Sequence, residues 1–181
     1  MTEKIINRRD LEFVLFELLD AEALTTRPRF ADHSRETFLA ALDTAEAIAA
    51  EKFASHNRKA DEHEPQFDGL RVSMIPEVKE ALKAFIDAGF MAAAHDYDLG
   101  GMQLPVTMTQ ACFSLFKGAN VSTSGYPFLT IGNANVIRRF GSPAQQEKYL
   151  KPLLAGRFFG TMALTEPQAG SSLSDITTRA A

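Results

Sequence analysis

Apolar residues spaced three and four positions apart are the feature that most constrains how this 181-residue chain can fold. The clearest run begins at Ser34, and several charged residues, including Asp43, Glu46 and Lys52, lie between its apolar members Phe38, Ala41, Leu42, Ala45, Ile48, Ala49 and Phe53. Because an α-helix turns once in about 3.6 residues, this spacing gathers the apolar side chains on one face. The sequence therefore predicts an amphipathic helix that packs against a core.

Further helices are predicted downstream by the same period and by proline and glycine signals. Pro76 can occupy a first helical turn, and Gly89 can take the left-handed conformation that ends a helix. Between them lie apolar residues at helical spacing, namely Val78, Ala81, Leu82, Phe85 and Ile86. Another helix is predicted from Pro105 through Phe116, and a fourth within Pro127 to Phe140.

The segment from Ser142 to Gln145 is typical of a capped helix start. Ser at the N-cap, Pro at the next position and Gln two residues later form a capping box, which predicts a helix ending near Leu150. Pro152 is predicted to begin a separate short turn that closes at Gly156. Upstream, the charged stretch from Lys59 to Gly69 is predicted to be a surface loop joining two helices.

A run of helices without alternating strands, and without a glycine-rich dinucleotide fingerprint, argues against a Rossmann enzyme. The net charge of -4 gives no electrostatic footprint for nucleic acid. The N-terminus lacks the apolar region of a signal peptide, and no segment approaches the roughly 18 apolar residues of a membrane span. With one cysteine, Cys112, in an apolar run, we predict a cytoplasmic protein with that thiol in the core.

Near the C-terminus an apolar run opens into a polar loop. The run Phe158 to Leu164 predicts a half-buried strand, since it lies between Gly156 and Pro167 and is rich in aromatic residues. In the loop that follows, Gly170 could take a positive φ or let a flat ligand approach the backbone. The hydroxyls of Thr165 and Ser171 could bind a carbonyl-rich ring or a thioester.

This loop, Thr165-Glu166-Pro167-Gln168-Ala169-Gly170-Ser171, closely resembles a segment of the acyl-CoA dehydrogenases. The resemblance extends over essentially the whole chain. It includes Phe140 to Leu150 with Pro152 to Gly156, the turn Asp98 to Pro105, and the start Asn7 to Leu19, which is similar to the branch with an extended N-terminus that contains methylmercaptopropionyl-CoA dehydrogenases.

The resemblance implies a mainly α fold, namely the N-terminal helical domain of that family followed by the first strand of its central β-domain. It implies an FAD-dependent enzyme that dehydrogenates a CoA thioester to a trans-2-enoyl-CoA. The implied partners are the acyl-CoA substrate, an electron-transfer flavoprotein as oxidant and, at full length, further copies in a homo-oligomer. The implied division is an N-terminal extension at 1–33, the helical domain at 34–156 and the start of the β-domain at 157–181.

By the same resemblance, a set of loop residues lies along the flavin: Met162, Leu164, Thr165, Gly170 and Ser171. Ser171 is also implied to lie close to the acyl-CoA. The family's catalytic base is a glutamate in a C-terminal domain beyond Ala181, so no catalytic residue is expected here, and Glu166 is predicted to shape the turn. The family usually has an acidic residue after Ser171, where this chain has Ser172, which puts loop anchoring in question.

The family usually continues for a few hundred residues past this loop, so the chain is expected to be a truncated enzyme. The alternative is a non-enzymatic helical module that binds a partner. A continuation encoding a β-barrel and a helical bundle in the neighbouring DNA would favour the enzyme.

Other candidate residues receive structural interpretations. The Asp61-Glu62-His63-Glu64 cluster is predicted to be a solvated loop and not a metal site, because adjacent side chains rarely converge on one ion. The histidines outside it lack metal-binding or triad spacing and are predicted to be surface or capping residues, namely His33, His56 and His95. The phenylalanine stripes are predicted to be core, including Phe13, Phe16, Phe38, Phe53 and Phe85.

Overall fold

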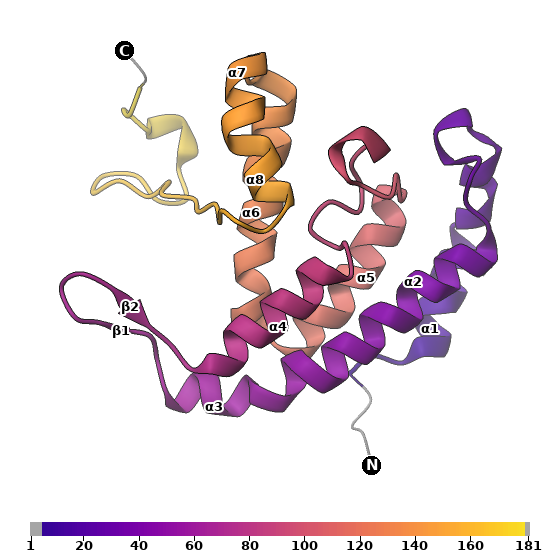
Figure 1. Cartoon of the computed structure of the whole chain (residues 1–181), viewed down its shortest axis with the longest axis horizontal. Helices are drawn as coiled ribbons and strands as arrows, with labels where there is room; N and C mark the ends of the chain where they lie inside the picture. Colours follow the sequence, from indigo (N-terminus) through magenta and orange to yellow (C-terminus); the bar gives the residue numbers. More distant parts are fainter. Residues whose placement is uncertain (1–4, 180–181) are drawn as a thin grey trace.

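The computed structural model describes residues 5–179, so residues 1–4 of the predicted extension and 180–181 of the predicted β-domain start lie outside the described residues. The described chain is mainly helical, as predicted (Figure 1). Its α-helices are α1 (Arg8–Glu12), α2 (Arg35–Ile48), α3 (Asn57–Glu62), α4 (Pro76–Asp87), α5 (Val106–Ala119), α6 (Val121–Phe140), α7 (Pro143–Gln145) and α8 (Lys151–Leu154). Short 3-10 and π-helical turns connect several of them.

The main core lies between α2, α4 and α5. The apolar face predicted from Ser34 onward is buried as expected, and a π-helical turn (Ala49–Phe53) carries α2 on to Phe53. Cys112 is also buried, and desolvation raises the pKa of its thiol to about 12. The predicted packing role of that cysteine is therefore confirmed.

A second, smaller core joins α6 to the helical run of α7 and α8. The capping box predicted at Ser142 is present: its hydroxyl accepts from the Gln145 amide at 3.3 Å, and the Gln145 side chain accepts from the Ser142 amide at 2.8 Å. The predicted helix end near Leu150 is wrong, because the helical run continues to Leu154. After the π-helical turn (Gln146–Leu150), Pro152 lies in the first turn of α8, where a residue without an N–H is tolerated.

Helix α6 begins earlier than predicted, at Val121 instead of near Pro127. Asn120 caps it by accepting from the Thr123 amide at 3.0 Å, and its side chain donates to the Phe53 carbonyl at 3.2 Å. Thr123 in turn bonds the buried ring of His56 at 2.8 Å. These buried contacts fix the helix start and place Pro127 inside the helix, where proline is normally unfavourable.

The N-terminal residues fold back on α2 through one arginine. Arg8 on α1 donates to Glu12 at 2.8 Å, to Asp43 at 2.7 Å and to Glu46 at 3.0 Å, and the last two lie on α2. Beyond α1, Phe16 is buried, whereas Phe13 is 47% exposed. The prediction that Phe13 belongs to the core is therefore wrong: the π-helical turn (Phe13–Leu18) buries Leu15 and Phe16, and Phe13 lies outside that buried face.

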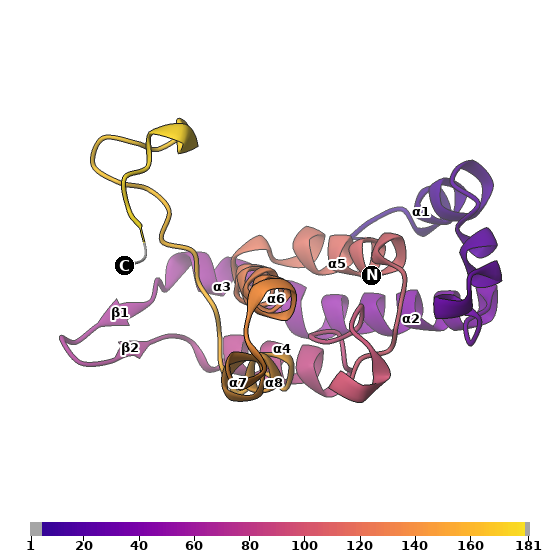
Figure 2. The same ribbon diagram turned by 90° about the horizontal axis from the view of Figure 1, so that it is seen from above.

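The stretch predicted as a surface loop from Lys59 to Gly69 is more ordered than expected. Helix α3 covers its start, and the paired strands β1 (Gln66–Phe67) and β2 (Val72–Ser73) form a hairpin around its end. The hairpin projects from the end of the helical body opposite α1 (Figures 1 and 2). The predicted exposure holds, since the hairpin residues are exposed.

The segment predicted as a strand, Phe158 to Leu164, is extended but forms no strand within residues 5–179. A strand requires a neighbour to pair its backbone groups, and the described chain brings no second strand alongside this one. The expected first strand is thus corrected to an extended, unpaired segment. It leads away from the helices toward the C-terminal turn (Leu173–Asp175) (Figure 1).

Candidate functional site

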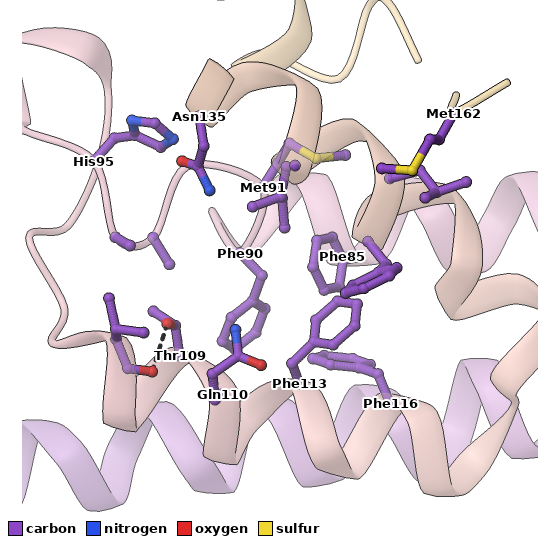
Figure 3. Close-up of a pocket in the computed structure, with 17 residues that line it drawn as sticks. Phe85, Phe90, Met91, His95, Thr109, Gln110, Phe113, Phe116, Asn135 and Met162 are labelled. Atoms are coloured by element: carbon purple, nitrogen blue, oxygen red, sulfur yellow. Dashed lines mark hydrogen bonds between the residues drawn. The ribbon is translucent and has the colours of Figure 1, made fainter. Parts of the chain in front are cut away.

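A cavity of about 230 Å³ lies between α4, α5 and α6, and the segment after α8 reaches it (Figure 3). The end of α4 and the turns after it supply Phe85, Phe90, Met91, Ala93, Ala94 and His95. Helices α5 and α6 supply most of the rest, Val106, Thr109, Gln110, Phe113, Phe116, Phe128, Leu129, Ile131, Gly132 and Asn135, and Met162 completes the wall. The lining is mainly apolar with a few polar groups, which is the usual composition of a small-molecule site.

Phenylalanine rings make one wall of this cavity rigid. Phe85 packs against Phe116 with ring centroids 4.9 Å apart, and Phe90 packs against Phe116 at 5.3 Å. Phe113 meets Phe85 edge-on at 6.1 Å. Such edge-to-face arrangements are favourable beyond the area that they bury. The wall therefore suits an apolar ligand group and keeps its shape.

The other end of the cavity is more polar. Figure 3 shows His95, Asn135 and Thr109 toward the end away from Met162. Thr109 donates its hydroxyl to the Val106 carbonyl at 3.0 Å and so has its donor engaged. His95 is buried, and its Nε2 has no hydrogen-bond partner among the residues described. Burial lowers the pKa of His95, with Arg138 and Arg29 adding to this and Asp96 opposing it, which favours the neutral ring.

The turn that carries His95 is held in place by ion pairs between Asp96 and two arginines. Asp96 accepts from Arg29 of the N-terminal segment and from Arg138 of α6, the latter at 3.2 Å. These two hydrogen bonds, with Arg29 the stronger influence, lower the pKa of Asp96. A pair of arginines from distant parts of the chain thus fixes the position of this side of the cavity.

The loop residues assigned to the flavin by resemblance separate into two groups in the structure. Met162 lines the cavity, whereas Leu164, Thr165, Gly170 and Ser171 lie exposed along the segment that follows. Within residues 5–179, neither the Thr165 nor the Ser171 hydroxyl has a hydrogen-bond partner in the protein. Both hydroxyls are therefore available to a ligand.

Two properties were predicted for Gly170, a positive φ and a backbone open to a ligand, and only the second is present. It does not adopt a positive φ, unlike Gly69, Gly89, Gly100 and Gly156. A β-carbon built at Gly170 would meet no described atom within 4 Å. The backbone at this glycine is thus open to close approach, which is the other property that the sequence suggested.

Glu166 shapes the loop, as predicted. Its carboxylate accepts from the Thr178 amide at 2.8 Å, and from the amide and hydroxyl of Thr177 at 3.0 and 2.9 Å. The Gln168 side-chain amide also donates to it, at 2.5 Å. Hydrogen bonds from Thr178 and then Thr177 lower the pKa of Glu166 to about 2. A carboxylate so strongly stabilised in its charged form anchors a turn well and is a poor proton acceptor.

The polar end of the cavity was missed from the sequence. His95 and His56 were predicted to be surface or capping residues. Neither is at the surface, because both rings are buried, although His56 occupies the N-cap position of α3 without a side-chain cap bond. For His95 a signal was available, since the apolar stretch from Phe90 to Ala94 directly precedes it. His33 does meet the predicted description, with Nε2 donating to the Met102 carbonyl at 3.0 Å.

The fold and the cavity define a helical domain with an internal, mainly apolar cavity beside an exposed polar loop. Residues 35–157 match the family described as "Acyl-CoA dehydrogenase, N-terminal domain". The chain belongs to the acyl-CoA dehydrogenase family, and its fold is the N-terminal helical domain of that family.

Individual relatives support this assignment. The chain is 31% identical over 168 residues to the 3-methylmercaptopropionyl-CoA dehydrogenase of Ruegeria pomeroyi, an alignment that covers 93% of this chain and 29% of the relative. It is 32% identical over 177 residues to the broad-specificity linear acyl-CoA dehydrogenase FadE5 of Mycobacterium tuberculosis, with 96% and 28% covered. A butyryl-CoA dehydrogenase of Syntrophomonas wolfei is 28% identical over 175 residues, with 94% and 28% covered. The chain thus spans less than a third of the length of these relatives.

Two other kinds of site are absent from residues 5–179. Over residues 5–179, no helix has both the length and the apolar character needed to cross a bilayer. In the same part of the chain, no three His, Cys, Asp or Glu side chains gather as metal ligands would.

Proposed function

We propose that this chain provides the helical domain, the acyl-binding cavity and one flavin-facing loop of an FAD-dependent acyl-CoA dehydrogenase. The reaction is the α,β-dehydrogenation of a CoA thioester to a trans-2-enoyl-CoA. One observation carries the proposal: Met162 belongs to the loop that the resemblance assigns to the flavin, and it also forms part of the cavity wall. An acyl group in the cavity would therefore have one end beside the flavin loop.

The residues of the loop fit the face of a flavin ring. From Met162 to Thr165 the backbone N–H and C=O groups make no hydrogen bonds to the described residues, and Gly170 leaves its backbone uncovered. The free hydroxyls of Thr165 and Ser171 add donors at the same exposed surface. FAD supplies the acceptor for the hydride that leaves the β-carbon of the substrate. Thr165 would bond to the pyrimidine side of the ring, and Ser171 would lie close to both the flavin and the acyl-CoA.

Removal of the α-proton is not assigned to a residue of this chain. Glu166 is the carboxylate nearest in sequence to the ligand-facing hydroxyls, but its lowered pKa of about 2 makes it a weak base. Its proposed task is to hold the loop in shape through Thr177 and Thr178.

The remaining parts of the proposal follow from the family. The division into an extension at 1–33, a helical domain at 34–156 and the beginning of a β-domain at 157–181 stays a proposal. We also propose an electron-transfer flavoprotein as oxidant, assembly into a homo-oligomer and a cytoplasmic location. The 181-residue chain alone is expected to lose FAD during gel filtration, because one loop leaves most of the cofactor uncovered. A purified chain that stays yellow and bleaches with acyl-CoA would contradict this expectation.

Methionine NMR provides a direct test of acyl binding by the chain itself. Met91 and Met162 line the cavity, whereas Met74 lies near the exposed hairpin. With methyl-13C methionine, octanoyl-CoA is expected to shift the Met91 and Met162 signals and to leave Met74 unchanged. CoA without an acyl group should shift neither cavity methionine. If octanoyl-CoA and CoA give the same spectrum, the cavity does not bind the acyl group and the proposed function is wrong.

A further inference from the structure

We propose that Phe90 closes one end of the acyl cavity and sets the longest acyl chain that it accepts. This inference rests on the proposed function. A second hollow, of about 450 Å³, lies on the far side of Phe90 between α2 and the loop before α5. Over the described residues, Phe90 is the one side chain that lines both the cavity and this hollow.

The sequence places Phe90 at this position through the end of helix α4. Gly89 has a φ of 80°, its amide donates to the Ile86 carbonyl at 2.8 Å, and the Phe90 amide donates to the Phe85 carbonyl at 3.2 Å. These are the two bonds of a Schellman motif, in which the residue after the glycine packs back on the last turn of the helix. The Phe90 and Phe85 rings meet accordingly, with centroids 5.6 Å apart.

The Phe90 ring is therefore a fixed partition. It is 7% exposed and also packs edge-on against Phe116 at 5.3 Å. Figure 3 shows it beside the other phenylalanine side chains of the cavity wall, Phe85, Phe113 and Phe116. A side chain held by its helix cap and by two neighbouring rings cannot swing aside without losing those contacts.

The two volumes predict a chain-length limit. A dry cavity of roughly 150 Å³ holds a six-carbon benzene molecule. On that scale the cavity of about 230 Å³ holds an acyl chain of roughly nine carbons. The hollow beyond Phe90 is lined partly by small or apolar residues, including Ala41, Ala88, Met102 and Leu104. Removing the Phe90 ring would open a path to this additional volume.

Replacement of Phe90 tests the inference, with affinities measured for octanoyl-CoA and dodecanoyl-CoA. In the wild-type chain the two are expected to bind about equally, because the last carbons of the longer chain stay in water. In Phe90→Ala each further buried methylene should raise affinity about fourfold. We therefore expect the dodecanoyl-to-octanoyl affinity ratio to rise at least tenfold, which corresponds to about two such methylenes.

Phe113→Ala is the matched control, since Phe113 has the same 7% exposure and lines the cavity without touching the hollow. It removes an equal ring from the cavity wall without opening a path to the hollow, so the ratio should rise much less than in Phe90→Ala. A double variant, Phe90→Ala with Ala41→Phe, refills the hollow and should restore the wild-type ratio. If Phe90→Ala does not fold, Phe90→Leu replaces it in the experiment. Leucine leaves more side-chain volume in place, so the affinity ratio should rise in the same direction but by less.

Met102 reports directly on the path of the chain, because it lines only the hollow. Dodecanoyl-CoA should shift the Met102 methyl signal in Phe90→Ala and not in the wild type. If Met162 shifts in both proteins but the ratio and Met102 stay unchanged, the role of Phe90 is wrong and the acyl cavity stands. An equal gain in Phe113→Ala, or a Met102 shift in the wild type, also overturns the role of Phe90. If no acyl-CoA shifts the signal of a cavity methionine, the proposed function is wrong, and so is the role of Phe90.

Discussion

Phe85 lies at the centre of the aromatic core, and its truncation to alanine should cost more stability than any comparable surface change. It is 1% exposed although it lines the cavity, so nearly all of its ring touches protein. Its ring centroid lies 4.9 Å from that of Phe116, 5.6 Å from Phe90, 6.1 Å from Phe113 and 6.4 Å from Phe53. Phe85→Ala therefore removes the common neighbour of the rings that join α4, the turns after it and α5.

The expected loss follows from burial and from the stiffness of the surroundings. Replacing a fully buried phenylalanine by alanine typically destabilises a domain by about 3–5 kcal/mol, and the loss is larger where neighbours cannot fill the void. The neighbouring rings are held by one another, so we expect about 4 kcal/mol for Phe85→Ala. Since domains are stable by only about 5–15 kcal/mol, the variant should be close to unfolding at moderate temperature.

Urea unfolding followed by far-ultraviolet circular dichroism measures this loss in the purified chain. Phe140→Ala is the control, because Phe140 is 80% exposed at the end of α6 and loses the same atoms. The control should change stability by no more than about 0.5 kcal/mol. A loss below about 1.5 kcal/mol in Phe85→Ala, or equal losses in both variants, would refute the packing described for this core.

The helical part of the fold was predictable because its signals are local. The period from Phe38 to Phe53 and the capping box at Ser142 each depend on residues within a few turns. The start of α6 was not predictable in the same way. Asn120 is a reasonable cap by itself, but its position is decided by bonds to Phe53 and, through Thr123, to His56, far away in the sequence.

The candidate site was only half predictable for the same reason. The loop residues stand together in the sequence, so Thr165 and Ser171 could be predicted as a pair, and the structure leaves both residues exposed. The cavity is assembled from α4, α5, α6 and Met162, and no single stretch of sequence carries its outline. The predicted strand failed because a strand is a property of two segments, and Phe158 to Leu164 has no partner strand in the part of the chain described.

The remaining predictions concern the polar contacts. Lowering the pH from above 4.5, the ordinary pKa of a glutamate, toward about 2 should release the loop. The pKa of Glu166 is lowered in the folded chain, so its carboxylate anchors the loop fully above this range and loses its hold as it protonates. The NMR signal of the Thr178 amide should follow this change in the wild type and should not depend on pH in Glu166→Gln. In a flavin-loaded enzyme containing this segment, Ser171→Ala should weaken FAD binding or turnover without changing the melting temperature of the apoprotein, and unchanged FAD affinity and turnover would remove Ser171 from the site. The last prediction concerns buried His56, whose Nδ1 donates to a backbone carbonyl at 2.7 Å, so that in the neutral ring Nε2 accepts from the Thr123 hydroxyl at 2.8 Å. Thr123→Val keeps the shape and removes the donor, which leaves a buried nitrogen unpaired and should cost about 1–3 kcal/mol. Thr123→Ser keeps the donor and should lose less, whereas equal urea midpoints for Thr123→Val and the wild type would show that this hydrogen bond does not stabilise the start of α6.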